Sequence, residues 1–126
     1  MPRTSAGVSA VNGGTVNFNL AAGTENVNRS YILLGTITGT EPGTPLPGGH
    51  VTLPLTWDLF TNIIISMINS SVFSNFMGQL DGQGSATAQL NLPPVPGFAG
   101  VTMYFAYALN KPWDFVSNPV PIEIVP

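Results

Sequence analysis

Hydrophobic and polar residues alternate with a period of two along much of the chain. Such alternation is typical of strands that bury one face, because successive side chains of a strand point to opposite sides. Gly, Pro and Asn recur every few residues between these runs, and helix signals are nearly absent. The pattern predicts eight strands, at residues 16–20, 31–38, 51–56, 61–68, 72–80, 86–92, 101–109 and 120–124.

The predicted strands differ in how central they are expected to be. Residues 101–109 carry the longest alternating face, so this strand is predicted at the centre of the core. Residues 31–38 begin apolar on both faces, which also indicates a central strand. Proline cannot donate to a strand ladder. Pro54 therefore places its strand at an edge, and Pro119 and Pro121 require an edge or a bulge for the last strand.

Residues 57–68 fit two structures. Their large side chains recur at a spacing that would line one face of a helix: Trp57, Phe60, Ile64, Met67 and Ile68. The run of three Ile residues and the Asn-Ser-Ser that follows favour a strand. We interpret 57–60 as a short turn and 61–68 as a strand.

Two segments are predicted to be turns or loops. Residues 39–50 hold three Pro and four Gly, which indicates a long surface loop. The sequence Asp81-Gly82-Gln83-Gly84 is a strong hairpin signal between the strands at 72–80 and 86–92. With no internal repeat or second composition zone, the chain is expected to form one domain, residues 1–126. Its predicted fold is an all-β antiparallel sandwich of about eight strands, of jelly-roll or Greek-key type.

The composition changes what surface and partners are expected. Only 7% of residues are charged, against about 25% in a typical soluble domain. Three Lys and Arg residues cannot neutralise many phosphates, which excludes an electrostatic nucleic-acid binder. The lack of Cys excludes a disulfide scaffold, and the longest apolar stretch, 63–68, is too short for a membrane span. So few charges give weak repulsion between copies, which favours self-association.

Catalytic and metal chemistry has little support in the sequence. A nucleophilic triad would need His50, the single His, with an acid such as Asp58, and no nucleophile motif accompanies them. One His without Cys excludes the usual zinc sites. Calcium at Asp81 and Gln83 would have too few ligands for a dedicated site. We therefore expect no enzyme activity, no catalytic residue, no metal and no cofactor.

Two tryptophans, each followed by an aspartate, suggest a different kind of site. Trp57 precedes Asp58, and Trp113 precedes Asp114. Aromatic rings stack on sugar faces and nearby carboxylates accept hydroxyl protons, so these four residues would suit glycan binding better than glycan cleavage. The alternative is that both aspartates cap turns and both tryptophans fill the core.

Sheet edges and an unusual apolar segment point to contacts between molecules. The N-terminal run 4–10 is a candidate strand without an obvious partner, which could pair within the chain or add to a neighbouring copy. Residues 63–76 are rich in Ile, Phe and Met, and would form a contact surface if exposed. The candidate self-association residues are Val8, Ile63, Ile65, Met67, Phe73 and Phe76.

The order of several turn and strand motifs resembles a recurrent module found in C-terminal regions of exported bacterial proteins, often after repeat arrays. The likeness spans most of the chain from about residue 8 to 126. Its motifs are YILLG (31–35), TGTEPG (38–43), LPL (53–55), LDGQGSATA (80–88), FAGVT (98–102) and SNPVPI (117–122). The resemblance implies an exported β-sandwich without an established catalytic residue.

These observations together predict a non-catalytic structural or interaction module. It is expected to self-associate into a homo-oligomer or filament, or to pack on a neighbouring domain. The expected location is extracellular or at the cell surface; no apolar leader follows Met1, so an exported protein would have lost its leader. The alternative is a glycan-binding module that uses exposed Trp or Tyr side chains.

Overall fold

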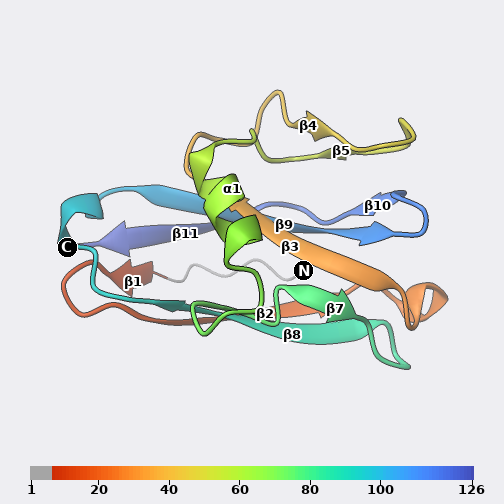
Figure 1. Ribbon diagram of the computed structural model, residues 1–126, viewed down its shortest axis with the longest axis horizontal. Helices are drawn as coiled ribbons and strands as arrows, with labels where there is room; N and C mark the ends of the chain where they lie inside the picture. The colour runs from red at the N-terminus through yellow and green to blue at the C-terminus, as the bar shows by residue number, and fades with distance from the viewer. Residues whose placement is uncertain (1–6) are drawn as a thin grey trace.

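The computed structural model describes residues 7–126, which form a β-sandwich-like fold of two facing sheets and one short helix (Figure 1). The large sheet has the strand order β1-β11-β9-β3-β7, and β10 also pairs with β9. The small sheet has the order β2-β8-β6, and β4 and β5 form a separate hairpin.

The strand bounds in the large sheet are β1 Gly7–Ser9, β11 Val120–Val125, β9 Thr102–Asn110, β3 Ser30–Thr36, β7 Met77–Gln79 and β10 Phe115–Val116. The bounds in the small sheet are β2 Gly14–Ala21, β8 Ser85–Leu92 and β6 Phe73–Ser74. The hairpin joins β4, Thr44–Pro45, to β5, Thr52–Leu53. The helix α1 spans Leu59–Ser66, and two short 3₁₀ turns span Thr24–Asn26 and Pro96–Phe98.

The predicted all-β fold is confirmed, with a mixed large sheet. All strand pairs of the described residues are antiparallel except β1 with β11. Both predicted central strands are also confirmed: β9 lies between β11 and β3, and β3 lies between β9 and β7. The strand count is higher than predicted, because several short strands carry no alternation that a sequence pattern can register.

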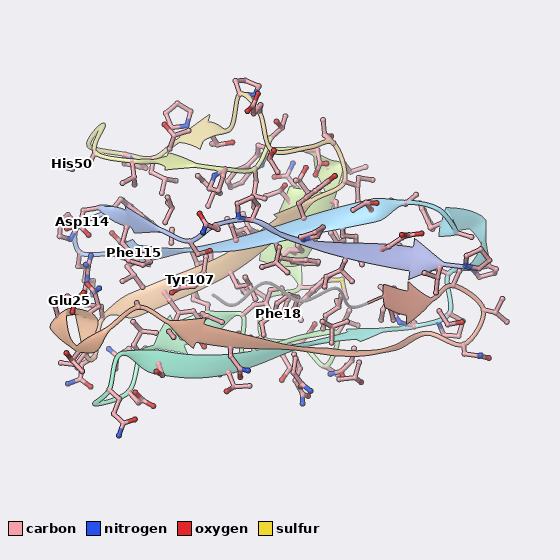
Figure 2. All side chains as sticks on the ribbon, turned by 180° about the vertical axis from the view of Figure 1, so that it is seen from behind. Phe18, Glu25, His50, Tyr107, Asp114 and Phe115 are labelled. Carbon is pink, nitrogen blue, oxygen red and sulfur yellow. The ribbon has the colours of Figure 1, made fainter. Side chains whose placement is uncertain are left out.

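The core lies between the two sheets, where the alternating apolar faces meet. Phe18 of β2 contacts Phe105 of β9 with ring centroids 5.0 Å apart, and Phe76 stands edge-on to both rings. Figure 2 shows Phe18 pointing from its strand into the interior. The inward side chains Val16, Phe18 and Leu20 are all buried, while the residues between them are exposed. The period of two in the sequence therefore reports which face of each strand is inside.

The prediction of a strand at 61–68 is wrong, because α1 occupies most of this segment. The helix crosses the front of the molecule in Figure 1 and packs on β3. Its two buried residues are Thr61, whose hydroxyl donates to the Gly35 carbonyl at 2.7 Å, and Ile64. A β-carbon at Gly35 would lie 3.0 Å from Ile64 and closer still to Phe105, so glycine permits this tight packing.

The hairpin prediction at residues 81–84 is right about the turn and wrong about the strands. The Asp81 carboxylate accepts the backbone N–H groups of Gln83 and Ser85, which lowers its pKa, and Asp81 N–H donates to the Ser85 carbonyl. The strands on either side then separate, since β7 pairs with β3 and β8 pairs with β2 and β6. The turn therefore connects the two sheets.

The structure also adds detail to the predictions for the chain ends and for the loop 39–50. The strand β11 is not an edge, because β1 pairs with Glu123–Val125, beyond both prolines. Ile124 N–H donates to the Val101 carbonyl, so the hydrogen-bonded positions along the ladder with β9 are Val120, Ile122 and Ile124. Pro121 lies between two of these positions, where the strand donates no hydrogen bond to β9. The part of the N-terminal run that is described pairs within the chain, as β1; residues 4–6 and Met1 lie outside the described residues. The loop contains β4, paired with β5.

Candidate functional site

The helix α1 forms because Asp58 caps its first turn. The Asp58 carboxylate accepts the Thr61 N–H at 3.0 Å, and the Thr61 hydroxyl accepts the Asp58 N–H at 3.2 Å. This reciprocal pair is a capping box, which satisfies backbone donors that a helix end leaves unpaired. Asn69, with φ of 60°, then turns the chain away just beyond the end of the helix.

The second carboxylate oxygen of Asp58 ties the helix to the end of β3. It accepts hydrogen bonds from the Thr36 hydroxyl at 2.7 Å, from Ile37 N–H at 2.9 Å, and from both the N–H and the hydroxyl of Thr38. Burial raises the pKa of Asp58, but the hydrogen bonds that favour the carboxylate outweigh it and hold that pKa well below its ordinary value. Asp58 is therefore fully engaged in holding α1 in place.

The solvent-facing sides of α1 expose large apolar side chains. Leu59 is 74% exposed, and the side chains of Ile63, Ile65 and Met67 are each about 40% exposed. Such exposure along one short helix is unusual, because helices of soluble proteins generally turn polar residues outward. We use the name α1 surface for these side chains and the exposed apolar residues next to them: Ile37, Trp57, Leu59, Ile63, Ile65, Met67 and Phe98.

A groove on one side of α1 brings the two tryptophans together. It lies between the β4–β5 hairpin and the outer face of the large sheet, with a volume of about 280 Å³. Trp57 and Ile65 line it from the helix side, Trp113 from the segment after β9, and Leu46 from the hairpin. Trp57 is 40% exposed and Trp113 is half-buried. This Trp groove could not be read from the sequence, because its two rings are far apart along the chain.

A second groove lies on the other side of the helix and is also apolar. Its volume is about 200 Å³, and it is lined by Ile37, Phe60 and Ile63 together with Phe98 and Val101 from the region before β9. Phe98, in the 3₁₀ turn, is 52% exposed. Phe98 and Leu59 were not predicted from the sequence to be surface residues. Two sequence signals could have indicated their exposure: Phe98 directly follows Pro-Gly, and Leu59 directly follows the helix cap.

Both acids predicted to accept sugar hydroxyl protons already have hydrogen-bond or ion-pair partners within the chain. Asp58 makes the contacts described above. Asp114 pairs with Arg29 at 2.7 Å, the one salt bridge among residues 7–126. Arg29 also donates to the Pro112 carbonyl at 2.6 Å and to the Asn26 side chain at 2.9 Å, so it holds the turn after β9. Trp57 donates its indole N–H to Asn62 at 2.8 Å.

The predicted self-association residues divide into two groups. Ile63, Ile65 and Met67 lie on the α1 surface. Val8, Phe73 and Phe76 are buried, so they do not meet the condition of exposure on which a contact surface at these residues depended. The aromatic pair contributes to the core, where their rings lie 5.3 Å apart, because β6 and the segment after it turn inward beneath α1.

The remaining candidates are separated from one another. His50 is exposed in the turn of the β4–β5 hairpin, at one end of the molecule (Figure 2), and makes no hydrogen bond with Asp58. Within residues 7–126 no three His, Asp or Glu side chains gather in a way that could hold a metal ion. No helix in that part of the chain is long and apolar enough to cross a membrane.

Comparison of the chain with models of protein families, with curated proteins and with solved structures gave no match.

Proposed function

We propose that this chain is a non-catalytic structural or interaction module that self-associates, or packs on a neighbouring domain, through the α1 surface. The single observation that supports this most is the apolar exposure around α1: Leu59, Ile63 and Met67 share one side of the helix, and Ile65 is exposed on the opposite flank. Exposed apolar patches of this kind mark contact sites in soluble proteins.

The size of the α1 surface suits such a contact. At the observed exposed fractions, and at roughly 200 Å² for a fully exposed large apolar side chain, it offers on the order of 600 Å². One partner of a standard protein–protein interface contributes about 800 Å². The grooves on both sides of the helix add concave surface into which a partner's side chains would fit.

The proposed contact depends on apolar burial and hardly on charge. The chain carries three Lys and Arg and six Asp and Glu residues, and two of these, Arg29 and Asp114, already pair with each other. We place the module outside the cell or at its surface, as the sequence resemblance implies.

The first experiment is sedimentation velocity over a concentration series from micromolar to millimolar, with negative-stain imaging of the same samples. The wild-type chain is expected to form discrete oligomers or filaments as concentration rises. The double variant Leu59→Gln/Ile63→Gln should weaken this association at least tenfold, since it removes two apolar side chains from the α1 surface.

The matched control is Val11→Gln, because Val11 is 63% exposed in the turn between β1 and β2, which lies at one end of the molecule in Figure 1. This variant should associate like the wild type. Equal association of the helix variant and the wild type would remove the α1 surface as the contact. A wild-type chain that stays monomeric would rule out self-association and leave only packing on a neighbouring domain.

Glycan binding is the second candidate, and one observation favours it: Trp57 and Trp113 line the same groove. The aliphatic lining and the engagement of both aspartates speak against it, because sugars need hydrogen-bond partners beside the rings. Titration of the wild type and of Trp57→Ala and Trp113→Ala with an oligosaccharide panel tests it. Binding that both variants lose would support this candidate, and no binding to any member would exclude the panel's sugars.

A further inference from the structure

The longest strand at a sheet edge is β2, which has a partner on one side within the described residues. All eight residues of β2, Gly14–Ala21, pair with β8, and β2 ends the strand order of the small sheet. The other strands of the two sheets that have one partner are β6 and β10 with two residues each, and β1 and β7 with three each. The backbone at the free edge of β2 therefore offers far more pairing capacity than any of these.

Two hydrogen bonds reveal which residues of β2 direct their backbone groups outward. Ala22 N–H donates to the Gly84 carbonyl at 2.9 Å, which makes this a hydrogen-bonded pair and sets the alternation along the ladder. Asn91, opposite Thr15, donates its N–H to Val72 on the far side of β8 instead. Thr15, Asn17 and Asn19 therefore point their N–H and C=O groups away from β8.

Within residues 7–126, the edge of β2 carries no charge, no proline and no bulge. Natural edges are shielded by charged side chains, by proline, by bulges or by being short. The sequence of β2 is GTVNFNLA, without charge or proline, and its register with β8 runs unbroken over eight pairs. An unprotected edge of this length is a template for main-chain pairing with another strand.

We propose that β2 pairs antiparallel with β2 of a second copy of this chain, so that two small sheets join into one continuous sheet. A twofold axis at Asn17 places Asn17 opposite its own copy and Thr15 opposite Asn19, and supplies about six main-chain hydrogen bonds. Val16 and Phe18 then stay on the interior face, while Thr and Asn side chains meet outside. Because β2 carries no charged residue, pairing it with its own copy brings no like charges together, and a second copy therefore fits this edge.

The edge of β2 is separate from the α1 surface, which lies at the opposite edge of the small sheet. There β6 is next to the helix, with Phe60 of α1 and Phe73 of β6 in contact at 6.2 Å between ring centroids. Substitutions at the two edges therefore test the two contacts separately.

The test is the double variant Asn17→Lys/Asn19→Lys, measured by sedimentation velocity against the wild type. Charges on the outer face of β2 should raise the Kd of the β2-mediated dimer at least a hundredfold. The matched control is Thr87→Lys/Gln89→Lys, which adds the same charge to the same exposed face of the sheet on the neighbouring strand β8. The control should stay within about threefold of the wild-type Kd.

Hydrogen exchange gives the second measurement. The amides of Thr15, Asn17 and Asn19 should exchange fast in dilute samples and become protected as the dimer forms. Protection of these amides in the dilute monomer, equal Kd values for the edge variant and the wild type, or a monomer at every concentration would each overturn the proposal. Loss of the dimer in the edge variant but not in Leu59→Gln/Ile63→Gln would support this contact and remove the α1 surface from self-association.

Discussion

The Tyr107 hydroxyl is the one buried side-chain polar atom among residues 7–126 without a hydrogen-bond partner. Its ring stacks on Phe115 with centroids 5.8 Å apart, as Figure 2 lets the reader follow. Burial raises the pKa of Tyr107; the Ala21 backbone opposes part of this rise, although the contact falls short of a hydrogen bond. The ring therefore stabilises the core while its hydroxyl carries a desolvation cost.

We expect Tyr107→Phe to stabilise the fold by about 1 kcal/mol, because it removes an unpaired buried polar group and keeps the ring. Urea unfolding should show a higher midpoint with an unchanged slope. A lower midpoint would mean that the hydroxyl is satisfied, for instance by a buried water.

Asp58→Asn should destabilise the protein by roughly 1–3 kcal/mol at pH 7. The amide oxygen can still cap the helix, but the amide NH2 cannot accept the hydrogen bonds from Thr36, Ile37 and Thr38 at the end of β3. The folded pKa of Asp58 is lowered, so the carboxylate contributes fully above its unfolded value near pH 4 and progressively less below it. The stability difference between wild type and variant should therefore narrow between pH 4 and pH 2.

Urea titrations at pH 7, 4, 3 and 2 measure this difference. Glu41→Gln, in an exposed loop, controls for the loss of one negative charge. A difference that stays constant down to pH 2 would show that the carboxylate charge does not strengthen the hydrogen bonds from the end of β3.

At the scale of an element, the turn between β7 and β8 depends on one close approach. Gly84 has φ of 75°, and a β-carbon there would overlap the Gly23 carbonyl. This contact holds the turn against the end of β2, where Ala22 N–H donates to Gly84. Gly82, two residues earlier in the same turn, has open space around it.

Gly84→Ala should therefore cost about 2–4 kcal/mol, since it adds both strain and overlap, while Gly82→Ala should stay within about 0.5 kcal/mol of the wild type. Thermal unfolding of the pair, followed by circular dichroism, compares them directly. Equal melting temperatures would show that the turn moves freely away from Gly23.

The elements also show how far the sequence alone could lead. Alternation identified β2, β3, β8, β9 and β11, because one buried face imposes a period of two on a strand. Alternation failed at α1, where the β-propensity of the Ile run favours a strand. The capping pair Asp58 and Thr61 stabilises a helix there instead, and this stabilisation depends on contacts with β3. Alternation also missed that β7 and β8 belong to different sheets, because a turn signal is local and strand pairing is not.

The candidate site was partly predictable for a related reason. Ile63, Ile65 and Met67 stood out by composition, and they are exposed. The burial of Phe73 and Phe76 follows from the path of the chain beneath α1, which composition does not contain. The meeting of Trp57 with Trp113 likewise requires the full fold.

At the scale of the whole molecule, the sparse charge leads to a prediction about salt. If association rests on apolar and main-chain contacts, its Kd should change less than about threefold between 50 and 500 mM NaCl. Sedimentation equilibrium across this range measures it, with added sulfate expected to strengthen the apolar contact. A tenfold or larger weakening by NaCl would indicate ion pairs between copies and contradict the proposed contacts.

The unequal edges of the small sheet set a limit on how far edge pairing can spread. Fibrillar growth needs a subunit that offers a usable edge on each side, so that every added copy exposes a fresh one. Here the pairing of β2 with β2 consumes the long edge of both molecules. The two ends of the joined sheet are then the two copies of β6. Each is two residues long, and its Phe73 already forms a β-bridge with Ile68. Pairing of this kind is self-terminating, so an unshielded strand can persist in this fold without seeding an endless aggregate.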